Sequence, residues 1–176
     1  QIGAVRVLSG QQINGEVFDT YVDPKRPIPP ASTKIHGITD TMVQGAPQFT
    51  HAAKKFHAFS NNAILVAHNA PFDLAFFKRE ESKTDLTFDH PVLDTVLLSA
   101  AIYGQSVPHT LDAIAERLNI TIEEKVRHTA LGDAIATAEV FLKLLPILKA
   151  QGIITLKDAQ NAMRKHQRLL SVQNAD

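Results

Sequence analysis

The sequence predicts an α/β protein built around a mixed sheet. Near its start, the segments Ile2–Leu8 and Glu16–Val22 are rich in strand-forming residues, and the first ends at the turn signal Ser9-Gly10. We expect these two strands to pair as a hairpin across a loop that covers Gly10–Gly15. After residue 47, segments with helical periodicity alternate with short apolar runs, which is the order typical of α/β layers.

The next elements follow from the placement of prolines and the spacing of apolar residues. Prolines crowd the segment Pro24–Pro30, so this stretch is predicted to be an extended surface loop. Pro47–Ser60 carries apolar residues at helical spacing and predicts an amphipathic helix. Ala63–Ala67 is a short, wholly apolar run, which is typical of a strand buried on both faces. A proline suits the first turn of a helix, so Pro71–Arg79 is predicted to be helical.

The second half of the chain is predicted to be largely helical. Ala130–Lys149 is the longest candidate helix, since it is rich in alanine and apolar at helical spacing. Thr155-Leu-Lys-Asp158 resembles a capping box that opens a last helix through about His166. We expect the end of the chain, Ser171–Asp176, to be frayed. The other predicted elements are a brief strand at Val92–Asp94 and helices at Thr95–Tyr103 and Thr110–Leu118.

Composition narrows the class of protein. The 176 residues suit one domain with a proper core, and 44% hydrophobic with 20% charged residues is ordinary for a globular chain. Basic and acidic residues balance at 18 each, which argues against a strong non-specific nucleic-acid binder but is compatible with an enzyme that grips only a chain end. The chain has no cysteine, which excludes disulfides, thiolate nucleophiles and cysteine-based zinc sites.

Targeting signals are not evident in the sequence. No apolar run approaches the roughly 20 residues that a bilayer span requires, and the first seven residues resemble a strand rather than a signal peptide. We therefore expect no membrane partner, and the absence of cysteine fits a cytoplasmic protein. Since the chain does not begin with methionine, we also expect the natural N-terminus to lie upstream.

Polar residues cluster where the apolar run of residues 63–67 ends. The segment His68-Asn-Ala-Pro-Phe-Asp73 leads into the predicted helix, and sites in open α/β sheets gather at the carboxyl ends of strands. Asp73 is expected in the first helical turn, where it could point back over the edge of the sheet. The alternative is that Asp73 only complements the helix dipole.

A second polar pair, His128 and Asp133, lies at the start of the longest predicted helix. Five residues of helix turn the direction by about 140°, so the two side chains cannot share one helical face. The workable arrangement places His128 in the loop before the helix and Asp133 inside it. A histidine on such a loop is a natural general base for water. The alternative is a surface histidine beside a solvated aspartate.

Four short segments occur in a distinctive order. They are Ile35-His-Gly-Ile-Thr39, His68-Asn-Ala-Pro-Phe-Asp73, Leu93-Asp-Thr95 and His128-Thr-Ala-Leu-Gly-Asp133. Together they resemble the DnaQ-like 3′–5′ exonuclease family, which includes the proofreading subunit of bacterial replicative polymerases, over about residues 1–148. Histidine five positions before the last aspartate resembles the His subclass (DEDDh). The resemblance implies an RNase H-like fold, with a mixed five-stranded sheet flanked by helices.

The resemblance also implies a two-metal phosphodiesterase that acts on the 3′ end of single-stranded DNA or short RNA and releases nucleoside monophosphates. Asp73 and Asp133 would be ligands of two Mg²⁺ or Mn²⁺ ions, and His128 would take the proton from the attacking water. A role in DNA replication or repair, with a fused domain or polymerase as partner, is implied as well. The residues expected near the substrate are His36, His68, Asn69 and Phe72. For Phe72 the alternative is core packing, and for His68 it is a fixed, hydrogen-bonded residue at the strand end.

The sequence departs from the family pattern in its first motif. That motif, Asp-x-Glu, supplies two metal-binding carboxylates from the strand before the one that opens this chain, and no Asp-x-Glu occurs in the sequence. We expect the natural protein to contain that first strand, which is missing here. A smaller departure is Ala31, which stands where many relatives carry glutamate.

Two further interpretations are kept open. The chain could be a catalytically inactive nucleic-acid-binding module of the same fold, or an unrelated α/β domain with chance motif matches. For the domain organisation, we expect an exonuclease domain at residues 1–148, lacking its first strand, and a C-terminal helical extension or linker at 149–176. Three basic residues of that extension, Arg164, Lys165 and Arg168, could contact nucleic acid or a partner domain, or form a solvated helix face.

Overall fold

A computed structural model describes residues 1–123, 125 and 127–173. The chain divides into two compact units. The first comprises residues 1–62, 76–89 and 123–135, and the second comprises residues 63–75, 90–122 and 136–176. Within the described residues, no helix combines the length and the apolar character that a membrane span requires.

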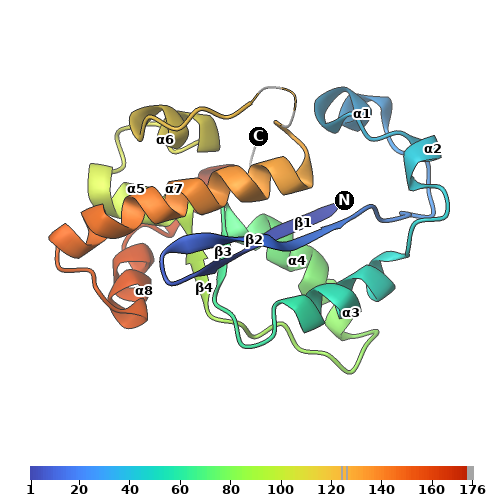
Figure 1. Ribbon diagram of the computed structural model, residues 1–176, viewed down its shortest axis with the longest axis horizontal. Helices are drawn as coiled ribbons and strands as arrows, with labels where there is room; N and C mark the ends of the chain where they lie inside the picture. Colours follow the sequence, from blue (N-terminus) through green and yellow to red (C-terminus); the bar gives the residue numbers. More distant parts are fainter. Residues whose placement is uncertain (124, 126, 174–176) are drawn as a thin grey trace. The chain divides into compact units, whose positions relative to one another are not determined.

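The order of helices and strands agrees closely with the α/β pattern predicted from the sequence (Figure 1). The elements are β1 (Ile2–Leu8), β2 (Gln11–Thr20), α1 (Pro30–His36), α2 (Asp40–Val43), α3 (Phe49–Phe59), β3 (Leu65–Ala67), α4 (Ala70–Glu81), β4 (Val92–Asp94), α5 (Thr95–Tyr103), α6 (Leu111–Arg117), α7 (Ala130–Ala150), α8 (Leu156–Arg164) and α9 (Arg168–Gln173). The described strands form two separate two-stranded sheets, an antiparallel one of β1 and β2 and a parallel one of β3 and β4. The frayed end predicted at Ser171–Asp176 falls partly on α9, and residues 174–176 lie outside the described part of the chain.

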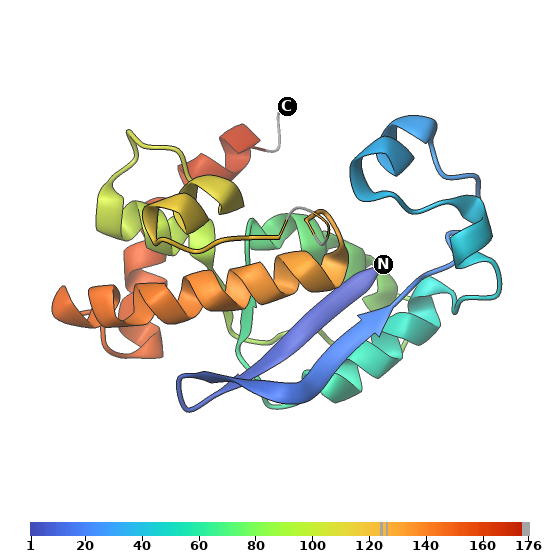
Figure 2. The same ribbon diagram turned by 45° about the horizontal axis from the view of Figure 1, so that its top comes forward.

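The β1–β2 hairpin differs from the prediction in its turn (Figure 2). The predicted loop over residues 10–15 is wrong, because β2 begins at Gln11 and only Ser9 and Gly10 connect the strands. Both residues have positive φ angles, 51° and 77°, which is the requirement of a two-residue turn that matches strand twist. The register shifts between Val5 and Val7, and this irregularity absorbs the extra length of β2.

The loop predicted to span residues 24–30 is followed by two short helices that the sequence did not predict. Pro30 occupies the first turn of α1, where its missing N–H costs nothing. Gly37 ends α1 at φ 71°, and the hydroxyl of Thr39 caps α2 by accepting from the Met42 N–H. These helices were missed because seven and four residues are too few to show a helical period.

Phenylalanines form the core of the first unit. Helix α3 follows the predicted segment 47–60 and contributes Phe56, whose ring stacks on that of Phe77 at 4.8 Å between centroids. Phe18 from β2 meets the ring of Phe56 edge-on at 5.7 Å, and Phe88 lies 5.0 Å from Phe77. Aromatic burial of this kind joins β2, α3 and the end of α4 into one cluster.

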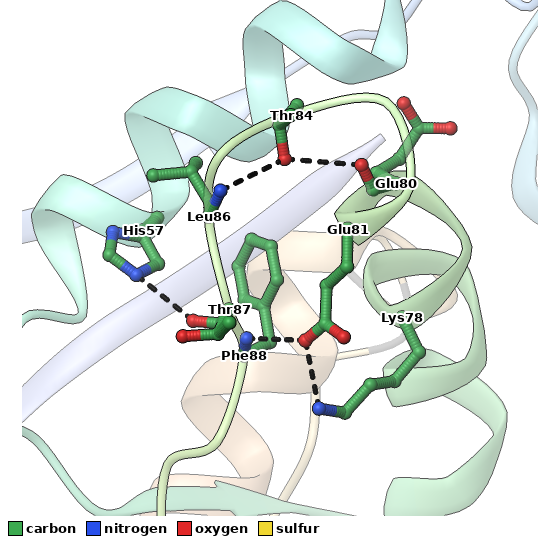
Figure 3. A network of polar contacts seen from close by, with 8 residues as sticks. All are labelled: His57, Lys78, Glu80, Glu81, Thr84, Leu86, Thr87 and Phe88. Atoms are coloured by element: carbon green, nitrogen blue, oxygen red, sulfur yellow. Dashed lines mark hydrogen bonds and ion pairs between the residues drawn. The ribbon is translucent and has the colours of Figure 1, made fainter.

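The loop after α4 is fixed by polar contacts at its two ends (Figure 3). The Thr84 hydroxyl donates to the Glu80 carbonyl at 3.1 Å, and the Phe88 N–H donates to the Glu81 carboxylate at 2.5 Å. Lys78 pairs with the same carboxylate at 2.8 Å. These contacts hold the Phe88 ring in the aromatic cluster, where it is only 3% exposed.

The second unit contains the parallel pair of β3 and β4. Val92–Asp94 matches the predicted strand, and its register sets Ala67 opposite Asp94. The prediction that residues 63–67 are buried on both faces is wrong, because Leu65, Val66 and Ala67 are half-buried and Ile64 is 46% exposed. Among the described strands β3 pairs only with β4, so its other edge is not covered by a neighbouring strand.

Helices α5 to α9 supply most of the core of the second unit. Leu98 and Ile114 are fully buried there, and Val140 and Leu144 from α7 pack in the same cluster. Helix α8 packs against α5 and β4 (Figure 2) and begins with the predicted capping box, in which Thr155 and Asp158 bond reciprocally. Its residue Met163 lies in this core, although it belongs to the segment predicted as an extension.

A buried histidine joins the end of α5 to the loop before α6. His109 is 6% exposed, and its Nε2–H donates to the Gly104 carbonyl at 2.8 Å. Its Nδ1 therefore accepts from the Ser99 hydroxyl at 2.9 Å, so the contact requires the neutral ring. Burial, with further repulsion from Arg117 and His166, lowers the pKa of His109 below its usual value.

We expect His109 to make the chain less stable in mild acid. Because its pKa is lowered in the folded state, the unfolded chain binds the proton first as the pH falls below about 6.5. The free energy of unfolding should then fall by up to about 1.4 kcal/mol per pH unit relative to His109→Gln. Urea unfolding of both proteins from pH 8 to pH 5 measures this difference, and parallel curves would contradict the prediction.

Candidate active site

Asp133 and His128 lie together at the beginning of α7. His128 is an exposed residue of the turn before the helix, and Asp133 lies in the first helical turn, as the sequence predicted. The His128 backbone N–H donates to the Asp133 carboxylate at 3.2 Å, which fixes the histidine in a left-handed conformation at φ 67°. The same carboxylate oxygen accepts from the Arg127 guanidinium at 2.6 Å. Asp133 thus faces a cationic group and keeps 37% of its side chain exposed.

The start of α7 rests directly on strand β1. A Cβ atom at Gly3 would lie 2.3 Å from the carbonyl carbon of Ala130, so only glycine permits this backbone approach. The Ala130 N–H also donates to the Gln1 side-chain oxygen at 3.3 Å. The first turn of α7, and with it Asp133, is therefore placed by backbone contact with the strand.

His36 ends helix α1 in the same unit. Its Nδ1 accepts from the Ile38 N–H at 3.0 Å, so the proton of a neutral ring is on Nε2. Ile35 beside it is 66% exposed, whereas Ile38 is buried. The predicted substrate-binding histidine is thus held at the end of a helix with an apolar neighbour facing solvent.

The other predicted site residues lie in the second unit, around the end of β3. His68 Nδ1 lies 2.8 Å from the Thr95 hydroxyl oxygen, which agrees with a fixed, hydrogen-bonded residue at the strand end. Asn69 follows at φ 62°, and its carbonyl accepts from the Phe72 N–H at 3.1 Å. Phe72 is 59% exposed, so the alternative of core packing is wrong for this residue.

Asp73 lies in the first turn of α4, as predicted. The residue is exposed at the surface. Partial loss of hydration of its carboxyl group, together with repulsion from Asp94, raises the pKa of Asp73 to about 6. A nearby cation would favour the ionised carboxylate.

Asp94 is a buried carboxylate between two helix starts. It is 3% exposed, and it accepts from the backbone N–H groups of Ala70 at 2.7 Å, Val96 at 2.8 Å and Asn69 at 3.3 Å. Burial raises its pKa, and these hydrogen bonds act in the opposite direction. Its own N–H donates to the sulfur of Met163 at 3.2 Å, which ties the site-bearing strand to α8.

The structure therefore places the predicted residues in two groups, one in each unit. The carboxylates of Asp73 and Asp133 offer the hard oxygen ligands that Mg²⁺ and Mn²⁺ prefer. In the described part of the chain, no three His, Asp or Glu side chains form a group able to hold a metal ion. The donor chemistry fits the expected ions, but the described ligands do not complete a site.

Sequence reasoning missed two contacts within the site. Arg127 was not singled out, although a basic residue directly before the histidine of the last motif was a visible signal. Asp94 was noted only as part of the segment Leu93-Asp-Thr95, because its link to Ala70 joins residues 24 apart and has no local signature.

Comparisons with known proteins agree with these motifs. Residues 1–141 match the family model described as "RNase_T: Exonuclease". The chain is 55% identical over 175 residues to a "DNA polymerase III subunit epsilon-like protein" of Rhodobacter capsulatus, covering 99% of this chain and 25% of that protein. It is 35% identical over 147 residues to the "DNA polymerase III subunit epsilon" of Pasteurella multocida, covering 82% of this chain and 58% of the relative. The chain thus spans about a quarter of the first of these relatives and under two thirds of the second.

A solved structure supports the fold. The structure titled "Exonuclease X in complex with 5′ overhanging duplex DNA" superposes with a TM-score of 0.68, covering 90% of this chain and 87% of its own, at 23% sequence identity. At that identity the likeness establishes the RNase H-like fold. Together with the family match, it confirms the resemblance found in the sequence. The chain belongs to the exonuclease family, of the DnaQ-like type.

Proposed function

We propose that this chain removes nucleotides from the 3′ end of DNA by metal-dependent hydrolysis. The observation that carries the proposal is that each motif aspartate lies in the first turn of a helix, Asp133 beside the exposed His128 and Asp73 beside the exposed Phe72. The relatives are named as DNA polymerase III subunits, and the structural neighbour is titled as a DNA complex, which favours DNA over RNA.

In this proposal, Asp73 and Asp133 bind two Mg²⁺ or Mn²⁺ ions through their carboxylate oxygens. Such ions, when bound, stabilise the charge that develops on the scissile phosphate. His128 accepts the proton of the attacking water, since its ring is exposed on the turn and its backbone is held by Asp133. Within its own unit, Arg127 neutralises Asp133 when no metal is bound.

The remaining site residues are proposed to hold the terminal nucleotide. His36 presents Nε2–H as a donor, and Phe72 offers an exposed aromatic face on which a base can stack. Asn69 and His68 shape the strand end beside Asp73. The products are nucleoside monophosphates, and we propose a role in DNA replication or repair, with a fused domain or polymerase as partner.

One observation favours a second function, a non-catalytic nucleic-acid-binding module. The 2.6 Å ion pair between Arg127 and Asp133 satisfies the carboxylate without a metal, and the described ligands do not complete a metal site. Such a module would bind single strands and leave them intact.

Incubation with a 5′-labelled single-stranded oligonucleotide and Mg²⁺ or Mn²⁺ tests both functions. The assay compares two proteins: the 176-residue chain, and the same chain preceded by any residues that its gene encodes before Gln1. A ladder that shortens from the 3′ end in either protein supports the exonuclease. Oligonucleotide binding without cleavage in both proteins supports the binding module and overturns the enzymatic proposal.

A further inference from the structure

The Asp94 carboxylate accepts hydrogen bonds from the starts of two helices, whereas a helix cap needs only one. One oxygen accepts from the Val96 N–H, which is the ordinary capping bond of its own helix α5. The second oxygen accepts from the Ala70 N–H at 2.7 Å, which is the shortest of its backbone contacts and belongs to helix α4. One buried side chain therefore fixes the starts of two helices that are far apart in sequence.

The link to α4 leads directly to Asp73. Ala70 and Asp73 share the first turn of α4, where three residues of helix form a rigid connection. The residue before Ala70, Asn69, is held by the other oxygen of Asp94 at 3.3 Å. A shift of this turn would move the Asp73 carboxylate with it, and misplacing a reacting group by about 1 Å can cost 100-fold in rate.

Only a carboxylate can serve both helices from this position. A hydroxyl has one oxygen, so it could cap α5 but not reach Ala70 as well. An amide would turn an NH₂ group toward one of the donors, since it has a single acceptor atom. The burial of Asp94, at 3% exposure, costs hydration that the backbone donors offset.

We propose that Asp94 is a positioning residue that sets the place of Asp73 by anchoring the first turn of α4. This inference rests on the proposed function, in which Asp73 binds the divalent cation. Asp158 is also a capping carboxylate, but its bonds to Ile154 and Thr155 stay within the start of α8. A substitution of Asp158 is therefore a matched control for a substitution of Asp94.

Substitution of Asp94 can separate its capping of α5 from its anchoring of α4. Asp94→Ser retains a good cap for α5 and loses the anchor of α4, so the variant should fold. We expect the Mn²⁺ concentration at half-saturation, measured by electron paramagnetic resonance, to rise by about 10- to 100-fold. The kcat for oligonucleotide cleavage should fall, while KM for the oligonucleotide changes less than about twofold. Asp94→Asn should have the same effects on Mn²⁺ binding and kcat as Asp94→Ser. Asp158→Asn should lower the melting temperature without changing Mn²⁺ binding.

The outcomes are distinguishable. If Asp94→Ser and Asp94→Asn bind Mn²⁺ as the unsubstituted chain does, the positioning role is overturned while the proposed function stands. If Asp158→Asn weakens Mn²⁺ binding as much, the effect is one of general stability and the inference is also overturned. If Mn²⁺ binds neither to the unsubstituted chain nor to the same chain preceded by the residues that its gene encodes before Gln1, or if Asp73→Asn leaves binding unchanged, the proposed function fails first and the inference fails with it.

Discussion

Replacing Asp133 by alanine should reduce 3′-end cleavage by at least 100-fold and leave the fold intact. In the proposed function this carboxylate binds a divalent cation, and such an ion supplies several kcal/mol of stabilisation to the transition state. Each 1.4 kcal/mol corresponds to a factor of ten in rate, so the loss of 3 kcal/mol or more gives about 100-fold or a larger effect. The measurement is the initial rate of nucleotide release from a labelled oligonucleotide at saturating Mg²⁺.

The folded state should tolerate this substitution because the ion pair it removes is partly exposed. Asp133 keeps 37% of its side chain exposed, and pairs of this kind contribute about 1 kcal/mol or less. Asp85→Ala, in an exposed loop of the same unit, is the matched control and should retain full activity. A variant of Asp133 that keeps more than a tenth of the activity would exclude this residue from the metal site.

Removing residues 153–176 should unfold the second unit. Met163 and Leu170 are 8% exposed in its core, and Ile153 and Leu156 pack against the same cluster. Side chains of this size each stabilise the fold by about 1.5–3 kcal/mol when fully buried, so the segment contributes on the order of 5 kcal/mol. That is comparable to the whole free energy of unfolding of an ordinary domain. Circular dichroism and thermal melting of the shortened chain measure the effect.

A point substitution checks the same prediction without shortening the chain. Met163→Ala should cost about 2–5 kcal/mol, because it leaves a cavity and removes the sulfur that accepts from the Asp94 N–H. Ile154→Ala is the control, since Ile154 is 70% exposed in the same segment. If the shortened chain melts as the full chain does, residues 149–176 form a separate extension, as the sequence suggested.

The sequence predicted best those elements whose signals are local. The helix at Thr95–Tyr103 has the predicted bounds, because nine largely apolar residues lie between Asp94 and Gly104. The capping box at Thr155 and Asp158 was also predicted, since all of its bonds lie within four residues. The placement of His128 before the helix and of Asp133 inside it followed from helical geometry alone.

Features that depend on distant contacts were not predicted. The half-exposure of residues 65–67 depends on which strands lie beside β3, and no local pattern reports this. The bond between Asp94 and Ala70 joins the end of β4 to the start of α4, which only the folded chain brings together. The Ser9-Gly10 turn was a local signal that was recognised, but the glycine at position 15 led to too long a loop, because a strand with an irregular register was not considered.

The contact between Gly3 and Ala130 couples the sequence of β1 to the position of α7. Strand β1 requires no glycine for its own geometry, because Gly3 is not among the residues with positive φ. The requirement comes from α7, which rests on β1: a Cβ atom added at Gly3 would lie 2.3 Å from the carbonyl carbon of Ala130. A side chain at position 3 could therefore become acceptable only after α7 had moved, and that movement would displace Asp133. The position of the Asp133 carboxylate, in the first turn of α7, therefore constrains which residue can replace Gly3. Glycine has this effect although it has no side chain that could take part in the chemistry.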